Sequence, residues 1–120
     1  MRVIVAGTRT FNSYEQLLAA IEEFPYQITE VVCGGATGAD ALGKLWAEKN
    51  GIPVKMFVAD WKKFGRAAGP KRNMKMGEYA DAALICWDGL SSGSKNMASI
   101  METLKKPCKI YYYKAEEKII

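Results

Sequence analysis

The chain of 120 residues contains no histidine. Imidazole is the commonest general base near neutral pH, the usual partner of a nucleophilic serine or cysteine, and a frequent zinc ligand. Its absence excludes those arrangements, so catalysis would have to rely on carboxylates, lysine, tyrosine or a bound metal. No pair of carboxylates has a spacing that indicates acid–base chemistry, and we expect no metal site.

Cysteine is scarce, and long apolar runs are missing. Cys33, Cys86 and Cys108 lie in or beside apolar stretches, without C-x-x-C spacing, so we expect small buried side chains and no disulfide framework. No apolar run approaches the ~20 residues that a membrane-spanning helix needs. The chain begins directly with a strand-like run and no signal-peptide pattern, which predicts a cytoplasmic protein without a membrane partner.

A dense basic run is also missing, although the formal net charge is +4. The lysines are spread through the predicted helices and loops, which favours a solvated lysine surface and argues against a nucleic-acid partner. A weakly basic surface does suit a ligand that carries phosphate. Length and an ordinary apolar fraction of 49% predict a single domain over residues 1–120.

Five short apolar runs alternate with stretches of helical periodicity. Strands are predicted at residues 2–6, 29–33, 54–59, 82–87 and 109–113. The intervening helices are predicted to start near Ser13, Thr37, Pro70 and Ser94, which are residue types that favour helix N-termini. Strict alternation predicts an α/β, three-layer Rossmann-like fold, with a five-stranded parallel sheet in the order 3-2-1-4-5 and helices on both faces.

In this fold the loops that follow the strands meet at the carboxyl edge of the sheet. Loops 7–12 and 88–94 flank the topological switch point, and the diglycine loop 34–38 lies beside them, so a ligand is expected in the crevice between them. The longer loop 60–69 carries Trp61 and Phe64, which would either stack on a base or cover the core.

The run from Val31 to Asp40 is the strongest local signal. A β-branched strand stops at Gly34 and Gly35, and a helix follows, so open backbone amides at the helix start would suit an anion. The alternative is a tight strand-to-helix turn without a ligand. Asp40 is expected to hold the loop from the first turn of the helix.

Hydroxyls, open amides and two arginines in these loops suit a phosphate group. Arg9 and Arg72 would add charge, and Asp88 would bind a sugar hydroxyl or a metal. The predicted ligand-binding residues are Gly7, Thr8, Arg9, Gly34, Gly35, Ala36, Thr37, Gly38, Asp40, Arg72, Asn73, Asp88, Gly89, Ser91, Gly93 and Ser94. The chain contains no G-x-x-x-x-G-K-[ST], and no G-x-G-x-x-G follows the first strand, which argues against a P-loop NTPase and an ordinary dinucleotide site.

Four blocks of sequence resemble one known family in the right order along nearly the whole chain. They are G-G-A-x-G-A-D from Gly34, A-D-W from Ala59, G-x-A-A-G-P-x-R-N-x-x-M from Gly65 and G-S-x-x-M from Gly93. Together they resemble the YspA-type branch of the SLOG superfamily, which joins the Smf domain of DNA-processing protein A and the Lonely guy enzymes. The resemblance implies a Rossmann-like fold that binds a nucleotide or a nucleotide-derived ligand.

The resemblance also bears on catalysis. The Lonely guy enzymes cleave the N-glycosidic bond of nucleoside monophosphates with an arginine and a glutamate, beside a phosphate-binding glycine-threonine pair. Arg72 matches the arginine and Gly93–Ser94 match the pair, but Met97 replaces the glutamate, with Asn96 beside it. Because a thioether cannot act as a base, enzymatic activity is left open and not favoured.

The function predicted from these observations is binding of a nucleotide-type ligand, as a sensor, carrier or sequestering protein, with no cofactor required. One alternative is a phosphoribohydrolase-like N-glycosidase that would use Arg72, Asp40 or Asp88. A second is a single-stranded DNA-binding protein. A homodimer is compatible with apolar surface at Trp61, Phe64 and residues 111–113, unless these side chains pack internally.

Overall fold

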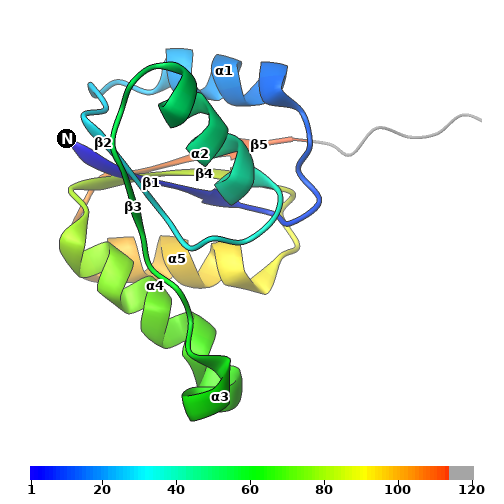
Figure 1. Cartoon of the computed structure of the whole chain (residues 1–120), viewed down its shortest axis with the longest axis vertical. Helices are drawn as coiled ribbons and strands as arrows, with labels where there is room; N and C mark the ends of the chain where they lie inside the picture. The colour runs from blue at the N-terminus through cyan, green and yellow to red at the C-terminus, as the bar shows by residue number, and fades with distance from the viewer. Residues whose placement is uncertain (114–120) are drawn as a thin grey trace, which may run out of the picture.

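A computed structural model describes residues 1–113 and contains a single sheet with helices on both sides (Figure 1). The elements in chain order are β1 (Arg2–Gly7), α1 (Tyr14–Glu23), β2 (Glu30–Cys33), α2 (Ala39–Lys49), β3 (Val54–Met56), α3 (Trp61–Phe64), a 3-10 turn η1 (Gly65–Ala67), α4 (Ala68–Tyr79), β4 (Ala82–Trp87), α5 (Ser92–Thr103) and β5 (Cys108–Tyr112).

The sheet has the order β3-β2-β1-β4-β5 with every neighbouring pair parallel, so the fold predicted from the sequence is confirmed. Helices α1 and α2 cover one face, and α4 and α5 cover the other (Figure 1). Strands β1 and β4 occupy the centre, where both faces are covered. Apart from Arg2 at the exposed start of β1, their side chains are therefore apolar, as expected for a buried parallel sheet.

Alternate side chains of the central strands pack into two separate hydrophobic cores, one on each face of the sheet. Val3 and Val5 point to the side of α1 and α2, where they join Leu17 in one apolar cluster. Ile4 points to the opposite side and joins Met76 and Met101 of α4 and α5. This period-two alternation fixes the register of the sheet, because a slip of one residue would exchange the two faces.

The structure differs from the sequence prediction between residues 54 and 69. Strand β3 ends at Met56 and not at residue 59, and the predicted loop 60–69 contains α3, η1 and the start of α4. The Asp60 carboxylate accepts a hydrogen bond of 3.1 Å from the Lys63 amide and so caps α3. Helix α4 begins at Ala68, two residues before Pro70. In Figure 1, α3 extends beyond the body of the domain.

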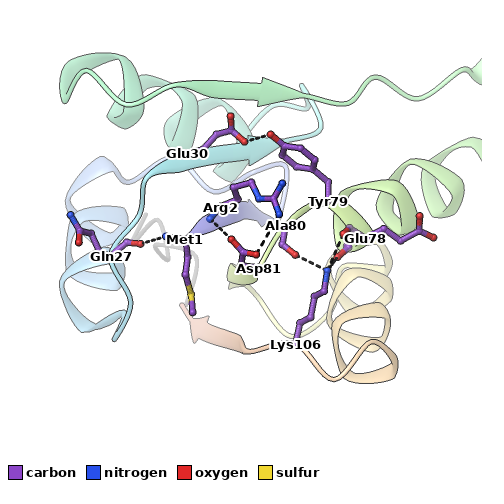
Figure 2. A network of polar contacts seen from close by, with 10 residues as sticks. Met1, Arg2, Gln27, Glu30, Glu78, Tyr79, Ala80, Asp81 and Lys106 are labelled. Carbon is purple, nitrogen blue, oxygen red and sulfur yellow. Dashed lines mark hydrogen bonds and ion pairs between the residues drawn. The ribbon is translucent and has the colours of Figure 1, made fainter.

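The amino edge of the sheet is closed by a polar network (Figure 2). The Asp81 carboxylate accepts a 2.8 Å hydrogen bond from the Arg2 amide and lies 3.6 Å from the Arg2 guanidinium. These contacts lower the pKa of Asp81, the Arg2 amide contributing most. The Tyr79 hydroxyl donates to the Glu30 carboxylate. These groups satisfy one another, so the network has a structural role.

Lys106 closes the end of α4 from outside the helix. Its ammonium group donates to the carbonyls of Gly77, Glu78 and Ala80 at 2.8, 3.0 and 2.8 Å (Figure 2). Carbonyls in the last turn of a helix have no intrahelical partner, and a cation there also interacts favourably with the helix dipole. The contact joins α4 to the segment that precedes β5.

We expect Lys106→Met to lower the free energy of unfolding by about 1–3 kcal/mol, since three carbonyls lose their donor and two of these hydrogen bonds are partly buried. Urea unfolding followed by circular dichroism measures this change. Lys109→Met is the matched control, because Lys109 is exposed and makes no side-chain contact of this kind in residues 1–113. Equal stability of the two variants would contradict a capping role for Lys106.

Within residues 1–113, no helix is both long and apolar enough to cross a membrane. The same residues contain no cluster of three or more cysteine or carboxylate side chains that could hold a metal ion. Cys33 and Cys86 are buried and free, as predicted, while Cys108 is half-buried. Burial raises the pKa of Cys86 to about 12, so this thiol is protonated at neutral pH.

Candidate functional site

A pocket of about 740 Å³ lies at the carboxyl edge of the sheet, above β1 and β4. It is built by the loops that follow these two strands, by the first turns of α4 and α5, and by one face of α3 and η1. The lining residues are Ala6, Gly7, Thr8, Arg9, Thr10, Ala36, Asp40, Trp61, Arg66, Gly69, Pro70, Arg72, Asn73, Met76, Ser91, Ser92, Gly93, Ser94, Asn96 and Met97.

The N-terminus of α5 forms one wall of the pocket. The hydroxyl of the N-cap residue Ser91 accepts no hydrogen bond from a backbone amide of the helix and donates to the Ser94 hydroxyl at 2.9 Å. The first-turn amides, which include Gly93, therefore have no side-chain cap. Amides of this kind, with the helix dipole behind them, bind anions.

Asp88 shapes this wall from outside the pocket. Its carboxylate accepts hydrogen bonds from the Leu90 and Ser91 amides at 2.8 and 3.0 Å. These bonds lower the pKa of Asp88, the Leu90 amide contributing most. The Asp88 amide donates to the Thr8 hydroxyl at 3.2 Å, which ties the loop after β4 to the loop after β1. Asp88 thus fixes the start of α5.

Arg72 forms the opposite wall and is held in place by neutral partners. Its Nη1 donates to the Gly34 carbonyl at 2.7 Å, and its Nε donates to the Asn73 side-chain carbonyl at 3.0 Å. The buried Asn73 amide nitrogen donates in turn to the Asn96 side chain at 2.9 Å. A chain of polar contacts therefore joins Arg72 to the first turns of α5, and the guanidinium is preorganised at the pocket surface.

Positive charge in the pocket exceeds negative charge. Arg9, Arg66 and Arg72 line it, and none of them forms a salt bridge within residues 1–113. Of the carboxylates in residues 1–113, only Asp40 lines the pocket. Arginine suits planar, multivalent oxygen ligands such as carboxylate and phosphate. The arrangement can bind an anion without first breaking an ion pair.

Asp40 is buried, with 6% of its surface exposed. It holds the glycine-rich loop of residues 34–38, called the glycine loop below. Its carboxylate accepts a 2.9 Å hydrogen bond from the Gly34 amide. Burial raises the pKa of Asp40, and the Gly34 amide and Arg72 oppose part of that rise. The predicted role of this residue, to hold the loop from the first turn of α2, agrees with these contacts.

The raised pKa of Asp40 gives a pH-dependent stability of known sign. The folded state binds the proton more tightly than the unfolded state does, so the contribution of Asp40 falls as pH rises from its unfolded pKa of about 3.9 through its folded pKa. We expect Asp40→Asn to gain stability relative to the native protein across this window. Urea unfolding of both proteins between pH 4 and 7 measures the difference.

The native protein also contains Asp81 and Asp88, whose lowered pKa values have the opposite effect and stabilise it above their unfolded pKa. These two groups are unchanged in Asp40→Asn, so their contributions cancel when the variant and the native protein are compared at each pH. A stability difference that stays constant or shrinks as pH rises would contradict the assignment for Asp40.

The glycine loop serves packing more than ligand contact. A Cβ on Gly38, which has φ +76°, would collide with the Thr8 carbonyl and with Arg9. A Cβ on Gly34 would collide with the Arg72 guanidinium. The Thr37 hydroxyl donates to the Arg9 carbonyl at 3.4 Å and does not cap α2, whose N-cap is Gly38. The loop after β2 is thus packed against the loop after β1.

The structure brings together most of the site residues predicted from the sequence. Those that line the pocket are Gly7, Thr8, Arg9, Ala36, Asp40, Arg72, Asn73, Ser91, Gly93 and Ser94. Those that lie outside its lining are Gly34, Gly35, Thr37, Gly38, Asp88 and Gly89. Among the latter, Gly34, Gly38 and Asp88 hold loops in place through the contacts described above.

Sequence reasoning missed a further part of the lining. Arg66 and Asn96 line the pocket and were not among the predicted binding residues, and Met76 and Met97 form part of its apolar surface. Arg66 could have been found from its place in the cation-rich stretch 60–69. Asn96 had no signal of its own, because its position depends on the contact with Asn73 across two helices.

A parallel sheet in this order, with a pocket at its carboxyl edge, defines a Rossmann-like α/β domain. A family model described as "YspA, cpYpsA-related SLOG family" matches residues 1–64. The chain belongs to that family, which suggests a nucleotide-related ligand-binding role.

One curated relative is similar over most of its length. The chain is 31% identical over 105 residues to the "Gene 61 protein" of Mycobacterium phage D29, an alignment that covers 79% of this chain and 83% of the relative. No solved structure is significantly similar to the chain. The resemblance seen in the sequence blocks is thereby confirmed at the level of the family.

Proposed function

We propose that the pocket binds a nucleotide or a nucleotide-derived small molecule, and that the protein acts as a sensor, carrier or sequestering protein. One observation carries the proposal: the first-turn amides of α5 and the preorganised Arg72 guanidinium face one pocket, and within residues 1–113 neither donates to a carboxylate. Two independent anion-binding features on one cavity favour a ligand with phosphate.

The phosphate group would lie between α5 and α4. The amides of Gly93 and Ser94 would donate to it from one side, and Arg72 from the other. Arg9 is exposed at the rim and would add a further charge. This placement differs from a phosphate on the glycine loop, where the Gly34 amide already donates to Asp40.

The remainder of the ligand would extend toward α3. Trp61 lines the pocket and is 53% exposed, so an indole face is accessible to a base. Met76 and Met97 supply an apolar surface deeper in the pocket. A volume of about 740 Å³ lies within the usual range for small-molecule sites and exceeds what a bare phosphate needs.

Binding without turnover is favoured over N-glycosidase chemistry. The position that aligns with the catalytic glutamate of the Lonely guy enzymes holds Met97, which is 1% exposed. Asp40 lines the pocket, but its carboxylate holds the Gly34 amide. A positioned general acid or base is what hydrolysis of a nucleotide would require.

A thermal-shift screen tests the proposal against nucleoside mono-, di- and triphosphates, cyclic nucleotides, NAD and ADP-ribose. A ligand that binds only the native state raises Tm as its concentration exceeds its Kd. Each stabilising compound is then incubated with the protein and recovered by chromatography. Stabilisation with intact recovery is expected. Recovery of free base and sugar phosphate would replace binding with hydrolysis, and the absence of any shift would contradict the proposal.

A further inference from the structure

Positive charge is concentrated in one segment of the chain, which supplies Arg66 and Arg72 to the nucleotide pocket and carries its lysines outside that pocket. Residues 50–76 contain seven lysines and arginines and one carboxylate, a net charge of +6, although the whole chain has +4. The remaining residues are therefore net negative. The lysines were predicted to be spread through the helices and loops, and this concentration differs from that prediction.

Several of these cations surround a groove between α4 and the segment that runs from β3 to α3. The groove has a volume of about 260 Å³, and its surface includes the apolar side chains of Phe57 and Phe64. Lys55, Lys71 and Lys75 line it and are exposed. Asp60 is the only carboxylate in the lining, and it is already used as the cap of α3.

The groove runs along an open edge of the sheet. Strand β3 pairs only with β2 within residues 1–113. The Pro53 carbonyl accepts from β2 and the Phe57 amide donates to it, so by alternation the backbone groups of Val54 and Met56 point away from the sheet. Beyond Met56, the Val58 side chain is 77% exposed. The edge thus offers free backbone groups beside apolar side chains.

We propose that this edge binds an extended acidic segment of a partner protein, which adds a strand to β3. Its backbone would pair with Val54 and Met56, its apolar side chains would cover Val58 and Phe64, and its carboxylates would face Lys55, Lys71 and Lys75. Strand addition supplies affinity through the backbone, and the charges supply selectivity. This surface shares only Arg72 with the lining of the nucleotide pocket, and the proposed strand uses no contact with Arg72, so the proposal does not depend on the proposed function.

The surface suits a peptide better than a nucleic acid. Nucleic-acid platforms need exposed aromatic faces on which bases stack. Here the Lys55 ammonium lies 5.8 Å from the Phe57 ring centroid, and those of Lys63 and Lys71 lie 5.1 and 4.7 Å from that of Phe64. The aromatic rings in the groove already have cations above them.

A second copy of this chain is also disfavoured as the occupant of the edge. Symmetric pairing of two β3 edges would bring the lysines of both copies together. Lysine on a short edge strand is a usual device against self-association. The carboxylates of an acidic partner would instead attract the same lysines.

The test uses a fluorescein-labelled, eight-residue peptide that alternates glutamate and valine, titrated into the full chain and followed by fluorescence anisotropy. Saturable binding is expected, together with at least tenfold weaker binding to Lys55→Glu/Lys71→Glu/Lys75→Glu. The matched control is Lys44→Glu/Lys95→Glu/Lys109→Glu, which has the same net charge and changes exposed lysines of α2, α5 and β5. It should bind within twofold of the native protein. Circular dichroism and Tm verify that each variant folds.

Two competitors separate strand addition from charge attraction. The same peptide with alternate backbone nitrogens methylated cannot form the added strand and should compete at least tenfold less well. An eight-residue oligodeoxythymidine should compete less well than the peptide. The proposal is overturned if the peptide does not bind, if both triple variants bind it equally, if methylation has no effect, or if the oligonucleotide competes better.

Discussion

Replacement of Arg72 by methionine is expected to weaken nucleotide binding about 100-fold, which corresponds to about 2.7 kcal/mol. Arg72 is held by Gly34 and Asn73 and forms no ion pair within residues 1–113, so its charge is available to the ligand. A charge-assisted contact to phosphate in a concave site accounts for an effect of this size. Isothermal titration with the nucleotide that gives the largest thermal shift measures it.

Two further variants make this result specific. Lys71→Met removes the neighbouring cation, which is exposed and outside the lining of the nucleotide pocket, and should leave Kd within twofold. Arg72→Lys keeps the charge but cannot contact Gly34, Asn73 and a phosphate at once, and should recover less than a tenth of the lost affinity. Equal losses for Arg72→Met and Lys71→Met would indicate a general charge effect and contradict the proposed phosphate site.

Replacement of Gly38 by alanine is expected to lower the free energy of unfolding by at least ~3 kcal/mol. Gly38 has φ +76°, and a Cβ there would collide with the backbone of Thr8 and Arg9. The positive φ alone costs on the order of 1 kcal/mol for a residue with a Cβ. The collision adds to it, because backbone cannot move aside as a flexible side chain can. Thermal and urea unfolding measure the loss.

Gly51→Ala is the matched control for this prediction. Gly51 also has a positive φ, +66°, but a Cβ there would meet open space. Its cost should therefore be confined to about 1 kcal/mol. If Gly38→Ala does not fold, its soluble yield is expected to be much lower than that of Gly51→Ala, and this comparison still distinguishes the Cβ collision from the cost of a positive φ alone. Similar stability of the two variants would show that close packing of the loops after β1 and β2 is unimportant.

Much of the fold could be predicted because its signals are local. The continuous apolar runs at β1 and β4 are typical of strands buried on both faces, and their alternation with helical periodicity determines a parallel sheet. The segment 60–69 was mispredicted as a loop because α3 is one turn long and lacks an apolar periodicity. Asp60, which caps α3, is a residue type that favours helix N-termini, and this signal could have indicated the helix.

The location of the pocket could be predicted from the sequence, but the role of each residue in it could be predicted less well. Carboxyl-edge loops follow from the topology, which explains why Arg9, Gly93 and Ser94 could be predicted to line one pocket. The glycine loop gave an ambiguous signal, since close backbone packing and anion binding both require glycine. The distinction between them depends on the contacts of Gly38 with Thr8, which no local pattern encodes.

The central claim is that a phosphate-bearing ligand binds between the N-terminus of α5 and Arg72. The most direct measurement is a titration of 15N-labelled protein with the nucleotide that gives the largest thermal shift, or with inorganic phosphate if none does, followed by amide chemical shifts. The account predicts the largest changes at Gly93, Ser94 and the loop 7–10. Changes confined to the amino edge, around Arg2 and Asp81, or no saturable change at all, would contradict it.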